Sequence, residues 1–351
     1  SCPVTRAGSF TLASQHQQER NYQFQKEPLC RQYVGRAIIN AERYFCIVEC
    51  LRKVTKLTLS FHIPCPAQNL HIPLKERFMK KLVLATLLCS LSLSAFAADY
   101  SVKPKVTELS TPPTRVLLVG NSFMYYNCGV NGYISGLSKS LGIKMSATMA
   151  TIGGAGLDWH LVKTYLRKDG LASYSTLNDG SNKLSFNKYP DGKVFEAVVL
   201  QDNSQGPIHP ELSKFFKKYA AIHSKDIRET GAEPIFLMTW AYADKPEMTK
   251  QLADATIAVA NENNAMVIPV GLAFANALKQ RPELKMTVAD NRHPTAAGTY
   301  LEAATILAAL TKKSPEGSSY LGGCEKPLKE KDAAFLQKVA WDTVKGFYGW
   351  K

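Results

Sequence analysis

Residues 115–123 have the sequence Arg-Val-Leu-Leu-Val-Gly-Asn-Ser-Phe, and this stretch decides the fold that we expect. The first five residues form a short apolar run that ends at a glycine, which is typical of a buried strand in a parallel sheet. A polar turn, Gly-Asn-Ser, follows directly at 120–122. Open parallel sheets bind ligands at the carboxyl ends of their strands, so this turn is the first candidate location for chemistry.

Four more apolar runs follow, and longer segments with helical periodicity separate them. We expect further strands at 144–150, 194–200, 234–239 and 265–270, and helices at 131–141, 157–168, 211–230, 247–264, 272–280, 295–311 and 330–348. Short strands that alternate with longer helices indicate a parallel sheet covered on both faces. The predicted class is α/β, a three-layer α/β/α sandwich with a five-stranded parallel sheet. Residues 169–193 are rich in Gly, Ser, Asn and Asp, which predicts a surface insertion.

The sequence before residue 98 has a different character. Two lysines at 80–81 precede an apolar segment at 82–93 and the sequence Ala-Phe-Ala at 95–97. These three parts form the pattern of a bacterial secretory signal peptide at 79–97. The pattern predicts export to the periplasm or the medium, with no stable membrane anchor after cleavage.

A signal peptide belongs at an N-terminus, so we expect residues 1–78 to be upstream sequence translated from a start codon assigned too early. A true N-terminal domain followed by an internal membrane anchor is the alternative. The expected mature chain begins near Ala98, with a polar, proline-rich lead-in at 98–114. One hydrolase-like domain with C-terminal helices would then span 115–351.

Charge and hydropathy exclude two broad classes of protein. The formal net charge is +14, but residues 98–351 hold 30 Lys and Arg against 24 Asp and Glu, with the two signs interspersed. This arrangement forms no basic patch, so we expect no nucleic-acid partner. No apolar run reaches the roughly 18 residues of a spanning helix, which argues against a multi-pass membrane protein.

Polar residues suited to acyl transfer follow several of the expected strands. Acyl transfer needs a nucleophile, a general base, an orienting carboxylate and donors for an oxyanion. The candidates, in chain order, are Ser122, Gly153, Gly154, Asn203, Gln205, Asp290 and His293. All of them are expected on the same rim of the sheet. No group of His, Cys, Asp and Glu has zinc-like spacing, and we expect no metal and no cofactor.

Four sequence blocks together resemble those of the SGNH (GDSL-type) hydrolase superfamily. They are Gly-Asn-Ser-Phe at 120–123, the glycine pair at 153–154, the amides after the third strand, and Asp-x-x-His at 290–293. The likeness covers about residues 115–312 and is greatest to the bacterial branch that begins Gly-Asn-Ser-Phe. The resemblance implies a flavodoxin-like fold, with Ser122 as nucleophile, His293 as general base and Asp290 as the group that orients the imidazole.

The resemblance also implies an oxyanion hole, formed by the Ser122 backbone N–H, by Gly153 or Gly154, and by an amide side chain. Asn203 and Gln205 are both candidates for that amide, because the third block departs from the family's Gly-x-Asn-Asp. We prefer Asn203, which is closer to the strand end and loses less side-chain entropy when it is fixed.

Four other residues near the rim are candidate substrate contacts: Asn121, His160, His209 and Trp240. Asn121 stands where the family usually has Asp, and Trp240 is either an aromatic platform for a sugar or a core residue. Cys128 and Cys324 are the two cysteines after residue 97, and we predict a disulfide between them, with two buried thiols as the alternative.

The function expected from this sequence is that of an exported serine esterase. It would hydrolyse O-acyl esters of a small molecule or a carbohydrate, such as O-acetyl groups, through an acyl-enzyme on Ser122. A lipase or thioesterase of the same fold, and a non-catalytic envelope binding protein, are the alternatives.

Overall fold

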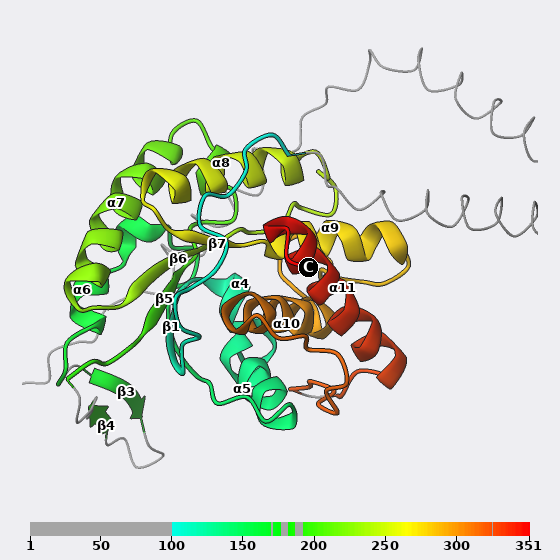
Figure 1. Ribbon diagram of the computed structural model, residues 1–351, viewed down its shortest axis with the longest axis horizontal. Coiled ribbons are helices and arrows are strands. Elements are labelled where there is room, and N and C mark those ends of the chain that lie inside the picture. The colour runs from blue at the N-terminus through cyan, green and yellow to red at the C-terminus, as the bar shows by residue number, and fades with distance from the viewer. Residues whose placement is uncertain (1–99, 170, 177–181, 187–191, 325) are drawn as a thin grey trace, which may run out of the picture. The chain divides into compact units, whose positions relative to one another are not determined.

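The computed structural model describes residues 100–169, 171–176, 182–186, 192–324 and 326–351 (Figure 1). Our predictions for residues 1–78 and for the signal segment at 79–97 lie outside these ranges. The chain divides into two units between Phe78 and Met79, and every described residue belongs to the second unit. Within the described ranges, no helix is both long and apolar enough to cross a membrane.

Five strands form one parallel sheet. They are β1 (Arg115–Gly120), β2 (Ser146–Thr151), β5 (Ala197–Leu200), β6 (Glu233–Leu237) and β7 (Met266–Ile268). Their order across the sheet is β2-β1-β5-β6-β7, and every neighbouring pair is parallel. The chain therefore winds outward in both directions from β1, which puts the topological switch point between β1 and β5. The predicted α/β class and five-stranded parallel sheet are confirmed.

Helices cover both faces of this sheet (Figure 1). One layer contains α6 (Val162–Tyr165), α7 (Ser213–Glu229) and α8 (Met248–Glu262). The other contains α5 (Val130–Ser140), α9 (Val270–Gln280), α10 (Ala296–Thr311) and α11 (Glu330–Tyr348). Because both faces are covered, the strands are apolar on both sides, and all four residues of β5 are buried.

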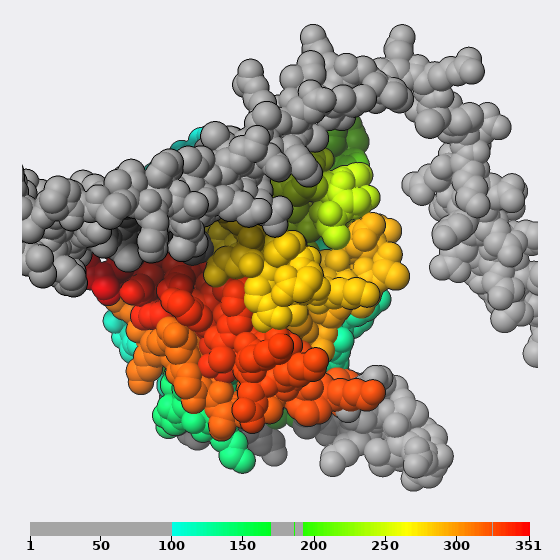
Figure 2. All heavy atoms as spheres, turned by 90° about the vertical axis from the view of Figure 1, so that its right-hand side faces the viewer, coloured from blue at the N-terminus to red at the C-terminus, as the bar shows by residue number. Residues whose placement is uncertain are grey.

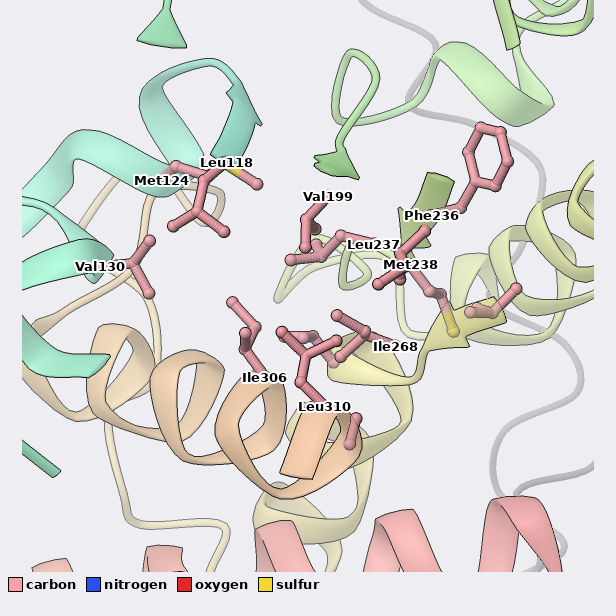
Figure 3. Close-up of a cluster of buried hydrophobic side chains, with 14 of the residues drawn as sticks. Leu118, Met124, Val130, Val199, Phe236, Leu237, Met238, Ile268, Ile306 and Leu310 are labelled. Atoms are coloured by element: carbon pink, nitrogen blue, oxygen red, sulfur yellow. The ribbon is translucent and has the colours of Figure 1, made fainter. Parts of the chain in front are cut away.

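Helix α10 is the centre of the second layer. It packs against α5, α9 and α11, and every residue from Ala297 to Thr311 is buried. Figure 3 shows Ile306 and Leu310 of this helix pointing toward Val199 and Ile268 of the sheet. Figure 2 shows the outer side of the same layer, where the yellow α9 and the red α11 reach the surface together.

Two segments differ from the sequence-based expectation. The helix expected at 157–168 is interrupted, because Leu161 has φ −101° and ψ 65° and separates the 3₁₀ turn η2 (Leu157–Trp159) from α6. The insertion expected at 169–193 contains an antiparallel hairpin of β3 (Leu171–Thr176) and β4 (Asn182–Phe186). Its Gly, Asn and Asp residues signalled a turn, but the short flanking runs gave too little alternation to predict strands.

The lead-in before β1 is fixed along the far edge of the sheet. The backbone N–H groups of Ser101 and Val102 donate to Asp254 Oδ1 of α8 at 2.6 and 2.9 Å. Val106 then forms a parallel bridge with Met266 of β7. This contact covers an edge strand whose backbone groups would otherwise be open to pairing with another chain.

Candidate active site

Ser122 lies at the carboxyl end of β1, where the chain turns sharply into the short helix α4 (Ser122–Tyr125). Asn121 between them is extended, with φ −139° and ψ −153°, and its side-chain oxygen accepts the N–H of Phe123 at 3.1 Å. This is a helix N-cap, the role that Asn performs best at such a junction. The turn places the Ser122 hydroxyl on the rim while leaving the residue only 9% exposed.

His293 connects Ser122 with Asp290. Its Nε2 lies 2.8 Å from Ser122 Oγ, and its Nδ1 lies 2.5 Å from Asp290 Oδ2. The second oxygen of Asp290 accepts the backbone N–H groups of Arg292 and His293. Partial burial opposes ionisation of Asp290, but these hydrogen bonds outweigh it and lower the pKa of the carboxyl. An ionised Asp290 favours the proton on Nδ1, which leaves Nε2 free to accept the serine proton.

Trp240 anchors the loop that carries the histidine. It is completely buried, and its ring is stacked between those of Phe123 and Phe274, with centroids 4.3 and 4.2 Å away. Its Nε1 donates to the carbonyl of Arg292 at 2.8 Å. Of the two alternatives for Trp240, the sugar platform is wrong, because a ring enclosed on both faces offers none to a substrate, and the core residue is confirmed.

Hydrogen bonds join the two loops that carry the predicted oxyanion residues. Asn203 Nδ2 donates to the carbonyl of Gly154 at 3.0 Å, and its Oδ1 accepts the backbone N–H of Gln205 at 3.3 Å. An amide nitrogen carries two N–H donors, so Asn203 keeps one for a ligand. The Ser122 N–H belongs to the first turn of α4, where backbone donors have no intrahelical acceptor. Gln205 is joined to this group through its backbone, and its side chain is half-buried.

A buried amide pair lies beneath the nucleophile turn. Gln201 Nε2 donates to Asn121 Oδ1 at 2.9 Å, while Asn121 Nδ2 donates to the carbonyls of Ala155 and Asp202 at 2.8 and 3.1 Å. Asn121 is 2% exposed and Gln201 is fully buried. Asn121 is therefore not a substrate contact, because its polar atoms are already used in joining three strand ends.

The Asn121–Gln201 pair also requires glycine at position 120. A Cβ added to Gly120 would lie 2.4 Å from Gln201 Oε1, closer than any side chain can approach. Sequence analysis missed Gln201, although a single amide directly after the apolar run of β5 is a usable signal for a buried polar contact.

Asp202 is a second buried residue that sequence analysis did not single out. Its Oδ1 accepts the N–H of Leu157 at 2.7 Å and thereby fixes the loop that follows the glycine pair. Burial raises the pKa of this carboxyl to about 7, against the opposing effect of its backbone hydrogen bonds.

Neither of the other predicted histidines reaches the serine. His160 is 1% exposed, with Nε2 3.0 Å from the carbonyl of Gly120 and Nδ1 3.3 Å from Tyr165 Oη. It supports the turn from below, so the expectation that it lines the site is wrong. His209 accepts the N–H of Glu211 at its Nδ1, at 3.1 Å, close to the start of α7.

A segment that sequence analysis overlooked, residues 126–128, lies against His293. The ring of Tyr126 lies parallel to that of His293, with centroids 4.2 Å apart and an interplanar angle of 8°. Asn127 donates to the carbonyl of Pro294 and to Thr299 Oγ1. A disulfide joins Cys128 to Cys324, with Cα atoms 5.5 Å apart.

The sheet order and the hydrogen-bonded Ser–His–Asp series together define a class of protein. It is a flavodoxin-like α/β protein with a hydrogen-bonded Ser–His–Asp series, an arrangement suited to acyl transfer, at the switch point between β1 and β5. No family model matches the chain, and no curated protein matches it.

Solved structures resemble the chain in fold. A DUF4886 family protein from Bacteroides uniformis is 20% identical, with a TM-score of 0.48, over 68% of this chain and 96% of that one. A protein from Slackia heliotrinireducens, named a putative SGNH hydrolase, is 21% identical, with a TM-score of 0.38, over 57% of this chain and 98% of that one. An acetylxylan esterase from Geobacillus stearothermophilus is 14% identical, with a TM-score of 0.38, over 56% and 93%. The fold that the sequence resemblance implied, a five-stranded parallel sheet with helices on both faces, is the fold of this chain.

Proposed function

We propose that this protein is a serine esterase that hydrolyses O-acyl esters. The observation that carries the proposal is the continuous series of hydrogen bonds from Ser122 Oγ through His293 to Asp290, at 2.8 and 2.5 Å. Each member has the neighbours that its role requires, and the series opens on the rim where a parallel sheet binds ligands.

The chemistry would proceed in two steps. Ser122 Oγ attacks the ester carbonyl as His293 Nε2 takes its proton, and the N–H donors of Ser122 and Asn203 stabilise the resulting oxyanion. The intermediate collapses to an acyl-enzyme when His293 returns that proton to the departing alcohol. Water then attacks the acyl-enzyme with His293 again as base, which releases the carboxylic acid and restores Ser122.

We propose small acyl groups, acetyl in particular, on a small molecule or a carbohydrate. Support comes from the hydrogen bond between Asn203 and the carbonyl of Gly154, which joins the two loops that would form the oxyanion hole. The acetylxylan esterase with a similar fold is a further, weaker support, since the likeness is limited to fold.

The test is turnover of p-nitrophenyl esters of acetate, butyrate and octanoate. We expect the acetate to react fastest and Ser122→Ala to abolish turnover. Ser146→Ala is the matched control, because Ser146 lies at the opposite end of the sheet, where its hydroxyl donates to the carbonyl of Thr114. A preference for octanoate would indicate a lipase or thioesterase. Absence of turnover, together with no labelling of Ser122 by a fluorophosphonate, would favour a non-catalytic binding protein.

We also propose that the protein is exported, with its mature N-terminus near Ala98. The signal-like pattern at 79–97 motivates this proposal, and the Cys128–Cys324 disulfide supports an oxidising compartment. Mass spectrometry of the protein recovered from the periplasm or the medium should find a first residue close to 98. Peptides from residues 1–78 in native cells would contradict this proposal.

A further inference from the structure

The segment at residues 126–129 has an unusual backbone. Asn127, Cys128 and Gly129 have consecutive φ values of 54°, 69° and 87°, all in the left-handed region. Glycine tolerates this region, but a residue such as cysteine adopts it at a cost in free energy. Strained residues of this kind persist only where the surrounding structure holds them, and they concentrate at functional sites.

Two separate anchors hold this segment in place. The Asn127 side chain donates to the carbonyl of Pro294 at 2.9 Å and to Thr299 Oγ1 at 2.8 Å, which attaches it to the loop behind His293. The disulfide attaches the next residue, Cys128, to Cys324. The Asn127 anchor thereby fixes the strained residues, and Tyr126 directly before them, against the segment that follows His293.

Tyr126 is the residue that this arrangement presents to the site. Its half-buried ring lies on one face of the His293 imidazole, 4.2 Å away and tilted by only 8°. Phe123 approaches the same imidazole edge-on, with centroids 5.7 Å apart and an angle of 73°. The imidazole therefore has an aromatic neighbour in two directions, in addition to its two hydrogen bonds.

The hydrogen bonds of an imidazole lie in the plane of its ring. A rotation about the Cβ–Cγ bond of His293 would move Nε2 away from Ser122 and Nδ1 away from Asp290 at the same time. A parallel ring at van der Waals distance blocks that rotation. During acyl transfer the imidazole becomes a cation, and the face of an aromatic ring attracts a cation.

We infer that Tyr126 is a positioning residue for His293, held by the strained segment at 126–129 so that its ring fixes the plane of the imidazole and stabilises the imidazolium. The inference rests on the proposed esterase function for its kinetic effect. The orientation of His293 can be measured without any substrate.

The kinetic test compares Tyr126→Phe with Tyr126→Leu on p-nitrophenyl acetate. We expect Tyr126→Leu to lower kcat by about three- to thirtyfold with KM within about twofold, because the ring acts mainly on the transition state. Tyr126→Phe keeps the ring face and should retain at least about half of the wild-type kcat. Phenylalanines with increasing fluorination at position 126 should lower kcat stepwise, since fluorine withdraws charge from the ring face while keeping its shape.

Tyr219→Leu is the matched control. Tyr219 also contacts a histidine, the non-catalytic His223 of α7, with ring centroids 5.7 Å apart. Its removal should leave kcat unchanged, and thermal unfolding of all variants should show that each is folded.

The second measurement is the proton NMR signal of His293 Nδ1–H, which a hydrogen bond to a carboxylate shifts far downfield. We expect this signal in the wild type and in Tyr126→Phe, and its broadening or loss in Tyr126→Leu. A sharp, unshifted signal in folded Tyr126→Leu would overturn the inference, even for a protein that hydrolyses no ester. Equal losses of kcat in Tyr126→Phe and Tyr126→Leu would also overturn it, because the effect would then belong to the hydroxyl. If the wild type fails to turn over esters while the Nδ1–H signal behaves as expected, the proposed function fails and the positioning role stands.

Discussion

The loop at 290–293 and the helix α10 that follows it each contain a carboxyl group. The two groups differ in exposure and in hydrogen bonding. Asp290 has a side chain that is 35% exposed and accepts hydrogen bonds at both oxygens, which lower its pKa. Glu302 of α10 is fully buried, and within the described part of the chain neither of its oxygens has a hydrogen-bond partner. Burial raises the pKa of Glu302 well above its ordinary value.

The difference between Asp290 and Glu302 separates residues that should affect turnover from residues that should affect stability. The carboxylate on the rim is hydrogen-bonded at both oxygens and partly exposed, so changes there should alter turnover more than stability. The carboxyl group of Glu302 lies in the buried helix layer that packs on one face of the sheet. An unpaired polar group there lowers the free energy of unfolding. Changes there should alter stability and leave turnover alone.

The largest expected effect is on the rim. His293→Ala should lower kcat by about 10⁴- to 10⁶-fold, because the serine loses its base, and adding Ser122→Ala should lower it little further. The midpoint of thermal unfolding should stay close to that of the wild type. Steady-state kinetics and calorimetry on the same preparations check both statements. Near-normal turnover in His293→Ala would remove this histidine from the reaction.

The next effect concerns the disulfide between Cys128, which directly follows Tyr126 and Asn127, and Cys324, which follows α10 in sequence. The bridge closes a loop with a sequence separation of 196 residues. Replacing both cysteines by serine should lower the free energy of unfolding by about 4 kcal/mol, because the unfolded chain regains the freedom that the bridge removes. Urea unfolding of oxidised, reduced and double-serine protein measures this. Two free thiols in unfolded, unreduced protein would contradict the bridge.

The third expected effect is on turnover alone and concerns Asn203, the preferred side-chain donor of the oxyanion hole. Asn203→Ala should lower kcat by about a hundred- to a thousandfold with little change in KM, as expected for a donor that acts on the transition state. Gln205→Ala is the matched control, because Gln205 contacts Asn203 through its backbone N–H, which the substitution keeps. A loss in Gln205→Ala and none in Asn203→Ala would assign the oxyanion amide to Gln205.

The smallest expected effect belongs to α10. A carboxyl whose pKa is raised on folding binds its proton more tightly in the folded state, so stability falls as the pH rises above the unfolded pKa of about 4.3. Glu302→Gln should remove this loss, with a gain that starts near pH 4 and grows by up to about 1.4 kcal/mol per pH unit. Glu233→Gln, at an exposed position, should show no such gain. The free energy of unfolding of the wild type and of Glu302→Gln, measured at several pH values, tests this prediction. A difference between them that does not change with pH would show that folding leaves the pKa of Glu302 unaltered.

Much of the fold could be predicted from sequence because its signals are local. The apolar run of β1 and the long amphipathic pattern of α11 each specify one element, and α11 begins and ends as predicted, at Glu330–Tyr348. The interruption of the helix expected at 157–168 left no such local signal, and its first residue, Leu157, is attached to Asp202, which is 45 residues away in sequence.

The candidate site divides in the same way. Ser122, Asp290 and His293 could be selected because each lies at an element boundary with a characteristic spacing, and the structure brings them together. The stacking of Tyr126 on His293 joins residues 167 positions apart and left no periodic trace. Trp240 could not be assigned between sugar platform and core for a related reason, since sequence cannot distinguish an aromatic ring held between two others from one that faces a substrate.

The Cys128–Cys324 bridge changes how the protein responds to proteolysis. It makes one closed ring of the chain from the end of the nucleophile turn to the loop beyond α10, and this ring includes β2, β5, β6 and β7. A protease that cuts one peptide bond inside the ring opens it without dividing the protein. The nicked molecule keeps its mass on a non-reducing gel and separates into two fragments only when a reductant is added, so damage to a surface loop need not release the half that carries His293.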